Sequence, residues 1–125
     1  LAAALWHEAI DLVDKGVATV EDVDKAVCAG PGLRWAIMGP HLTYHLAGGE
    51  GGMEYYIEHL GPAMSARWKT MGNWTTISPQ AASKLTQGIK ETEQVRTKTR
   101  EEIIEWRDSR LLELLKLLYP SRDRR

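Results

Sequence analysis

The sequence of 125 residues contains no phenylalanine and a single cysteine, Cys28. One cysteine cannot form a disulfide bond within the chain, so a reducing compartment fits and we expect a cytoplasmic protein. We expect Cys28 itself to be a small, buried apolar residue. The sequence also lacks an apolar run long enough to span a bilayer, which argues against a membrane protein.

A strongly basic region is absent as well, since the formal net charge is −1. Residues 1–65 carry three basic and nine acidic residues, whereas residues 96–125 carry nine basic and six acidic ones. This balance argues against nucleic-acid binding, including a helix-turn-helix reader at residues 8–28. The acidic and basic ends either attract each other, within or between subunits, or form a solvated surface without a role.

No segment alternates between apolar and polar residues at period two, so we expect no β-sheet. Apolar residues instead recur at helical spacing along the chain. Residues that commonly cap helices, among them Thr19, Ser78 and Thr99, precede several of these segments. The sequence predicts an all-α fold, a helical bundle of about five to seven helices. We expect residues 1–118 to form one domain and residues 119–125 a C-terminal tail. The predicted helices cover 1–15, 20–29, 40–46, 52–60, a short turn within 62–71, 79–95 and 100–119.

The two ends of the predicted domain are unusual. Apolar residues recur at helical spacing from the start of the chain, yet no capping residue precedes Leu1. We therefore expect a fragment cut from a longer protein. The stretch LLELLKLL at 111–118 is apolar over more than one stripe. Such a helix is either buried in the core of its own domain or also in contact with another subunit or domain, and we favour the second alternative.

The glycine-rich stretch at Gly48–Gly52 does not have the features of a nucleotide cradle. It follows a predicted helix, lacks the G-x-G-x-x-G spacing, and contains Glu50, whose charge would repel a phosphate. We interpret this stretch as a flexible connector between two helices.

His41 and His45 share one helix face at the i, i+4 spacing that zinc-binding helices use. The peptidase version of that motif requires a glutamate directly after the first histidine, and Leu42 stands there. We therefore favour histidines that hydrogen-bond in an interface or line a pocket, and predict no metal site. His7 and His59 are isolated, and we expect structural or exposed roles for them.

The sequence contains no evident catalytic group. No serine lies in a nucleophile elbow, and no pair of carboxylates has a spacing that indicates acid–base catalysis. We interpret Glu8, Asp11 and Asp14 as the solvent-facing side of the first helix.

Tryptophan and tyrosine are present where phenylalanine is not: the chain has five tryptophans and four tyrosines. Trp35, Tyr44, Tyr55 and Tyr56 lie in or beside the glycine-rich stretch. Their ring faces can attract cations, and quaternary ammonium groups are often bound in this way. From these residues alone core packing is the favoured role and a ligand cage the alternative.

Two motifs resemble a known family. The stretch ALWHEAIDLVDKGVATVEDVDKAV at 4–27 and the stretch GPGLRWAIMGPHLTYHLAGG at 30–49 are similar to the C-terminal domain of the 3-hydroxyacyl-CoA dehydrogenase family. The second stretch, extended to Met53, resembles its bacterial L-carnitine dehydrogenase branch, with the gulonate dehydrogenase and lambda-crystallin branch as a near relative. The resemblance is specific over residues 1–60 and looser to residue 118.

The resemblance implies a division of labour. In this family an N-terminal Rossmann domain binds NAD and supplies a catalytic histidine–glutamate pair. The helical domain forms one wall of the substrate cleft and the contact of the homodimer. The Rossmann domain is missing from this sequence, as is the Asn–Arg or Asp–Arg pair that usually precedes the position of Leu1. We thus assign no catalytic, cofactor-binding or metal-binding residue here and expect the isolated chain to be inactive. We expect helical faces including residues 100–118 to form a homodimer.

A carnitine substrate would present a trimethylammonium group, which requires aromatic faces. We predict Trp35, Tyr44 and Tyr56 for that contact, with Arg34 as a carboxylate anchor or a purely structural residue. Carnitine, gulonate and a hydroxyacyl-CoA all remain open as substrates. The alternative function is a non-enzymatic helical interaction module whose only role is dimerisation.

Overall fold

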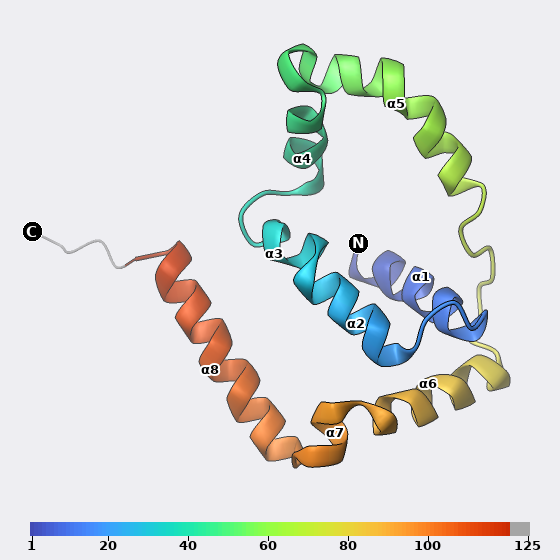
Figure 1. Cartoon of the computed structure of the whole chain (residues 1–125), viewed down its shortest axis with the longest axis vertical. Coiled ribbons are helices and arrows are strands. Elements are labelled where there is room, and N and C mark those ends of the chain that lie inside the picture. The colour runs from blue at the N-terminus through green and yellow to red at the C-terminus, as the bar shows by residue number, and fades with distance from the viewer. Residues whose placement is uncertain (121–125) are drawn as a thin grey trace, which may run out of the picture.

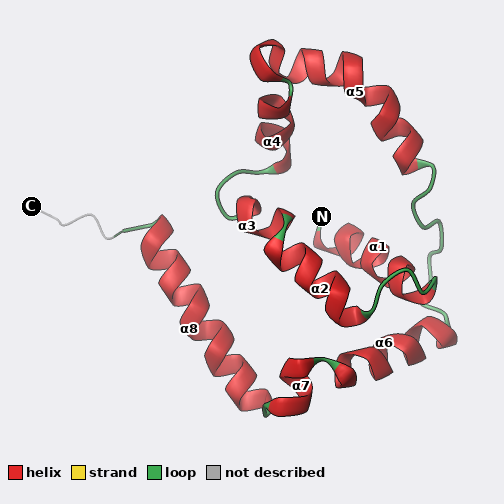
Figure 2. Cartoon of the chain, in the orientation of Figure 1, coloured by secondary structure: helices red, strands yellow, loops and turns green. Residues whose placement is uncertain are grey.

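The computed structural model describes residues 1–120, and every regular element in that range is a helix (Figure 2). This confirms the predicted all-α fold. Residues 121–125 of the predicted tail lie outside the described residues. The elements are α1 (Ala2–Asp14), α2 (Val20–Ala29), α3 (Pro31–Trp35), α4 (Pro40–Ala47), the 3-10 helix η1 (Gly49–Gly51), α5 (Gly52–Trp68), α6 (Pro79–Glu91), α7 (Glu93–Thr97) and α8 (Arg100–Leu118).

Three helices begin at the residues that the sequence indicates. The hydroxyl oxygens of Thr19 and Thr99 accept hydrogen bonds from the backbone N–H groups of Asp22 and Glu102, and both pairs form complete capping boxes. Ser78 caps α6 in the same way, with Pro79 at the first helical position. These helix starts depend only on residues three positions apart, which is why the sequence predicts them.

Two helix boundaries, near Pro62 and near Thr92, differ from the prediction. We expected a stop at Gly61–Pro62, but α5 continues through Pro62 to Trp68. A proline within a helix removes one backbone donor and bends the axis, and Figure 1 shows α5 changing direction along its length. Conversely, the helix predicted over 79–95 is interrupted, because Thr92 is extended and its hydroxyl donates to the Ile89 carbonyl oxygen at 2.8 Å.

The helices divide into a small core and two extensions (Figure 1). The helices α1, α2 and α6 pack on one another, and within the described residues the buried apolar side chains are Ile10, Val23 and Ala81, one from each. Figure 1 shows α4 and α5 as an arm that extends away from this core, while α8 leaves α7 in another direction.

Large apolar side chains lie at the surface on both extensions. On α8, the leucines at 111, 112, 114, 115 and 117 are between 39% and 77% exposed, so no single face of this helix is covered. A chain of this length ordinarily buries about two-thirds of its unfolded surface. None of the helices in residues 1–120 combines the length and hydropathy that crossing a membrane requires.

The expectation that Cys28 is buried is wrong, because its side chain is exposed. On α2, Val23 is buried and Val20 and Val27 are partly buried, with Val20 close to Gly88 of α6. Cys28 lies on a different side of α2, and that side faces the space between α2 and α8. Burial of a small residue depends on which helix covers its face, and the sequence around Cys28 does not specify that.

The glycine-rich connector between α4 and α5 is a tight turn. Gly49 and Gly52 have φ angles of 61° and 59°, a region that favours glycine. A Cβ at Gly48 would collide with the carbonyl oxygen of Gly52, and a Cβ at Gly52 would lie 2.6 Å from His45 Cε1. The absence of side chains here allows α4 and α5 to fold back on each other.

We predict that Gly48→Ala lowers the free energy of unfolding by about 1–3 kcal/mol, because the new methyl group meets backbone that cannot move without opening the turn. Urea denaturation followed by circular dichroism measures this change. Gly61→Ala, inside α5, is the matched control, since a Cβ at Gly61 meets only Ile57 Cγ2 at 3.9 Å, and we expect no loss because alanine is favoured over glycine within a helix. Equal losses for both variants would contradict the tight-turn explanation.

Candidate functional site: an aromatic groove between α4 and α5

The candidate site is a groove of about 510 Å³ between α4 and α5. Tyr44 of α4 and Tyr56 of α5 both line it and pack on each other, with ring centroids 5.0 Å apart and planes tilted by 34°. The lining also includes His41 of α4 and Met53, Met64 and Trp68 of α5. The lining includes no aspartate, glutamate, lysine or arginine.

Local sequence features position both walls of the groove. Pro40 stands at the first position of α4, and the glycine-rich turn then reverses the chain. On α5, lining residues recur three to four positions apart from Met53 to Trp68, so they share one helix face. The Met53 N–H donates to His45 Nδ1 at 3.1 Å, which joins the start of α5 to α4.

This arrangement suits a cation that carries methyl groups. The faces of tyrosine and tryptophan rings attract cations, and the attraction strengthens when water is excluded. Methionine side chains add flexible apolar surface. The volume also lies in the range of small-molecule pockets, which is roughly 300–1,000 Å³. A quaternary ammonium group is therefore a better match than an anion.

The structure brings together two of the four predicted substrate contacts. Tyr44 and Tyr56 line the groove, whereas Arg34 and Trp35 lie on α3 and do not line it. Both α3 side chains are exposed, Trp35 to 44%. Their role in substrate binding stays a prediction.

The sequence analysis missed Trp68 as a lining residue. The signal was the three-to-four-residue spacing from Met53 through Tyr56 and Met64 to Trp68. The expected helix stop at Gly61–Pro62 concealed it, because a break there would leave Trp68 without a defined face.

The two histidines of α4 have separate roles in the structure. His41 lines the groove, and His45 accepts the Met53 N–H at the turn. No group of three or more histidine, cysteine, aspartate or glutamate side chains is placed to hold a metal ion anywhere in the described part of the chain. His59 is exposed and stacks on Tyr55 with ring centroids 3.9 Å apart.

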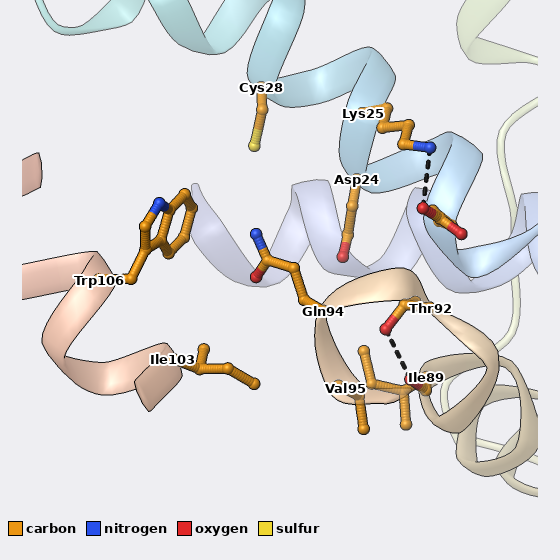
Figure 3. A pocket seen from close by; sticks show the side chains of 10 residues that line it. Asp24, Lys25, Cys28, Ile89, Thr92, Gln94, Val95, Ile103 and Trp106 are labelled. Atoms are coloured by element: carbon orange, nitrogen blue, oxygen red, sulfur yellow. Dashed lines mark hydrogen bonds and ion pairs between the residues drawn. The ribbon is translucent and has the colours of Figure 1, made fainter. Parts of the chain in front are cut away.

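A second groove, of about 560 Å³, lies among α2, α6, α7 and α8 (Figure 3). Figure 3 shows Cys28 and Trp106 directed into it from α2 and α8. At its edge Lys25 Nζ lies 2.8 Å from Glu21 Oε1, and this contact raises the pKa of Lys25 above its ordinary value. This pair joins two of the three charged residues of the lining, the third being Asp24, and the other lining residues are mostly apolar.

The interpretation of the α1 acids as a solvent-facing surface is wrong. Asp11 is only 8% exposed and accepts a hydrogen bond from Trp74 Nε1 at 3.2 Å. Glu8 is partly buried and accepts from the Gly72 N–H, and Asp14 is paired with Lys84. The loop after α5 and the helix α6 cover these acids, and both are more than 60 residues away in sequence.

The described residues do not form a dinucleotide site. The glycine-rich turn follows the helix α4 instead of a strand, and its backbone is packed against itself at Gly48 and Gly52. Dinucleotide cradles instead present free backbone N–H groups at the start of a helix that follows a strand.

Comparison with known proteins identifies the family. Residues 1–106 match the family described as 3-hydroxyacyl-CoA dehydrogenase, C-terminal domain. The chain is 42% identical to an L-carnitine dehydrogenase of Bacillus cereus over 120 residues, which cover 94% of this chain and 35% of that protein. It is 40% identical to the L-carnitine dehydrogenase of Nocardiopsis dassonvillei over 92% of this chain and 34% of that protein.

A shorter match is more similar still. Over 68 residues, 54% of this chain and 22% of the relative, the chain is 56% identical to the L-carnitine dehydrogenase of Oceanobacillus iheyensis. The chain spans about a third of the length of the Bacillus and Nocardiopsis relatives. These matches and the all-helical architecture show that the chain belongs to the 3-hydroxyacyl-CoA dehydrogenase family, as its C-terminal domain.

Proposed function

We propose that this chain supplies part of the substrate pocket and a subunit contact in an NAD-dependent L-carnitine dehydrogenase. The reaction would oxidise the hydroxyl group at carbon 3 of carnitine, with NAD as hydride acceptor. The observation that carries the proposal is the aromatic groove lined by Tyr44, Tyr56 and Trp68, which contains no aspartate, glutamate, lysine or arginine. The relatives named L-carnitine dehydrogenase, which match most of this chain, support it.

The residues of the groove would bind and orient the substrate. The trimethylammonium group of carnitine would lie against the faces of Tyr44, Tyr56 and Trp68, and each such contact contributes roughly 0.5–2 kcal/mol. Met53 and Met64 would exclude water from the methyl groups. Arg34 remains our proposal for a carboxylate anchor.

Because the described residues offer no dinucleotide cradle, we place NAD binding and the catalytic acid–base groups on a domain outside this chain. Such a domain would meet the exposed apolar faces of the helices. The isolated chain would then bind substrate weakly and catalyse nothing.

The exposed apolar surface of α8 favours a second role for the chain, as a subunit contact. Its leucines are exposed on several sides, and apolar surface of this extent on a helix is typical of an interface. We propose that α8 contacts a second copy of the chain. Dimerisation as the sole function is the alternative to the enzymatic role.

We predict that Tyr56→Ala raises the KM for L-carnitine about tenfold or more in the complete natural polypeptide, because a cation–π contact and apolar cover are lost. Steady-state kinetics with NAD measure this change. Tyr55→Ala is the matched control, since Tyr55 stacks on His59 and does not line the groove. Equal effects of the two substitutions, or an equal loss for a substrate analogue without the trimethylammonium group, would refute the assigned contact. Absence of any carnitine oxidation by the unchanged protein would refute the proposed activity.

We predict that Leu112→Glu weakens self-association of the same polypeptide at least about tenfold, because a carboxylate would have to be desolvated in the subunit contact. Sedimentation velocity over a concentration series measures the dissociation constant, and circular dichroism checks that the helices persist. Arg110→Gln, at an exposed position on the opposite side of α8 from Leu112, changes the net charge by the same amount and is the control, which leaves association unchanged. If both variants associate like the unchanged protein, α8 is not the contact.

A further inference from the structure

The linker at residues 69–78 joins the α4–α5 arm to the core and contains no helix. It passes beside α1 and is tied to it through side chains. Trp74 stacks on His7 with ring centroids 3.8 Å apart and an interplanar angle of 14°. The Trp74 indole N–H donates to Asp11, and the Gly72 N–H donates to Glu8 Oε1 at 3.2 Å. These contacts fix the end of the arm on the core.

The close approach at Gly72 shows how tightly the linker lies on α1. A Cβ at this position would lie 2.9 Å from His7 Cε1 and 3.0 Å from Asp11 Oδ1. The linker backbone is therefore packed directly against the side chains of α1.

His7 is placed between two hydrogen-bond acceptors. Its Nδ1 lies 3.0 Å from Glu8 Oε1, and its Nε2 lies 2.8 Å from the backbone carbonyl oxygen of Trp74. Neither an ionised carboxylate nor a carbonyl oxygen can donate a hydrogen bond. A neutral imidazole has one N–H and satisfies one of these acceptors, whereas the protonated ring has two and satisfies both.

We propose that His7 is a pH-sensitive latch, which in its protonated form holds the 69–78 linker, and with it the α4–α5 arm, against α1. Loss of the proton removes one of the two hydrogen bonds and loosens the linker. The latch is independent of the proposed enzymatic function, because it rests on contacts within the chain and not on a substrate.

The charges around the ring agree with this geometry. The hydrogen bond to the Trp74 carbonyl, followed by that to Glu8, raises the pKa of His7 above its ordinary value of 6.5, and the negative charge of Asp11 adds to the effect. On α1, Lys15 is bound to Asp11, and from α6 Lys84 is bound to Asp14. The linker faces the ring with Gly72 and Trp74, which carry no charge.

The direction of the pH effect follows from the pKa shifts. Since the pKa of His7 is raised on folding, its stabilising contribution is complete below pH 6.5 and is lost as the pH rises through the folded value. The hydrogen bond from Lys15 lowers the pKa of Asp11, so the contribution of Asp11 is present above its ordinary value of 3.8 and is lost as the pH falls through the lowered value. The latch is therefore closed in mildly acidic solution.

Hydrogen exchange in the complete natural polypeptide tests the latch. We expect the protection factors of residues 69–78, corrected for intrinsic exchange, to fall at least about threefold between pH 5.5 and pH 8. Protection of α2 should not change. In His7→Gln the linker should show the same low protection at both pH values. His59→Gln, which alters a histidine outside the cluster, should keep the full response.

An NMR titration provides a second measurement that does not depend on the stability of His7→Gln. The pKa of His7 should lie above 6.5 in the unchanged protein and fall in Glu8→Gln, which keeps the side-chain size but removes the charge. A His7 pKa below 6.5, or linker protection that is equal at both pH values, would overturn the proposal. A pH response that persists in His7→Gln would do the same.

Discussion

The shortage of buried apolar surface constrains everything else about this chain. Ile10, Val23 and Ala81 form the apolar core of the described residues, while leucines, tryptophans and tyrosines on the arm and on α8 remain exposed. Burial of apolar surface is the main favourable term in folding, at about 25 cal/mol per Å². Helices as exposed as α8 are therefore expected to gain much of their stability from surfaces that this chain does not itself supply, which is why we propose a second subunit and a second domain.

With so little core, polar contacts set the arrangement of the extensions. The arm is closed on itself by the turn at Gly48–Gly52 and by the hydrogen bond between Met53 and His45. It is attached to the core through His7, Glu8 and Asp11, which bind the linker. Hydrogen bonds at the partly exposed α1–linker contact are individually weak, so the orientation of the arm is open to control by protonation.

The aromatic groove is located on this same arm, and the packing that orders the arm also builds the groove. Tyr44 and Tyr56 meet because the glycine turn packs α4 against α5, and Trp68 joins the groove lining because α5 continues past Pro62. Membership of the family fixes the scaffold, and the groove residues then decide which ligand fits it.

The sequence by itself determined the features that depend on neighbouring residues. The capping boxes at Thr19 and Thr99, the all-helical fold and the family motifs all arise from residues within a few positions of one another. Only the tertiary structure decided which faces those helices bury. Asp11 is covered by a loop more than 60 residues away along the chain, whereas no element covers Cys28. Trp68 reaches the groove because α5 continues through Pro62. Whether a side chain is buried depends on the elements that the fold packs against it, and short-range patterns in the sequence do not specify those elements.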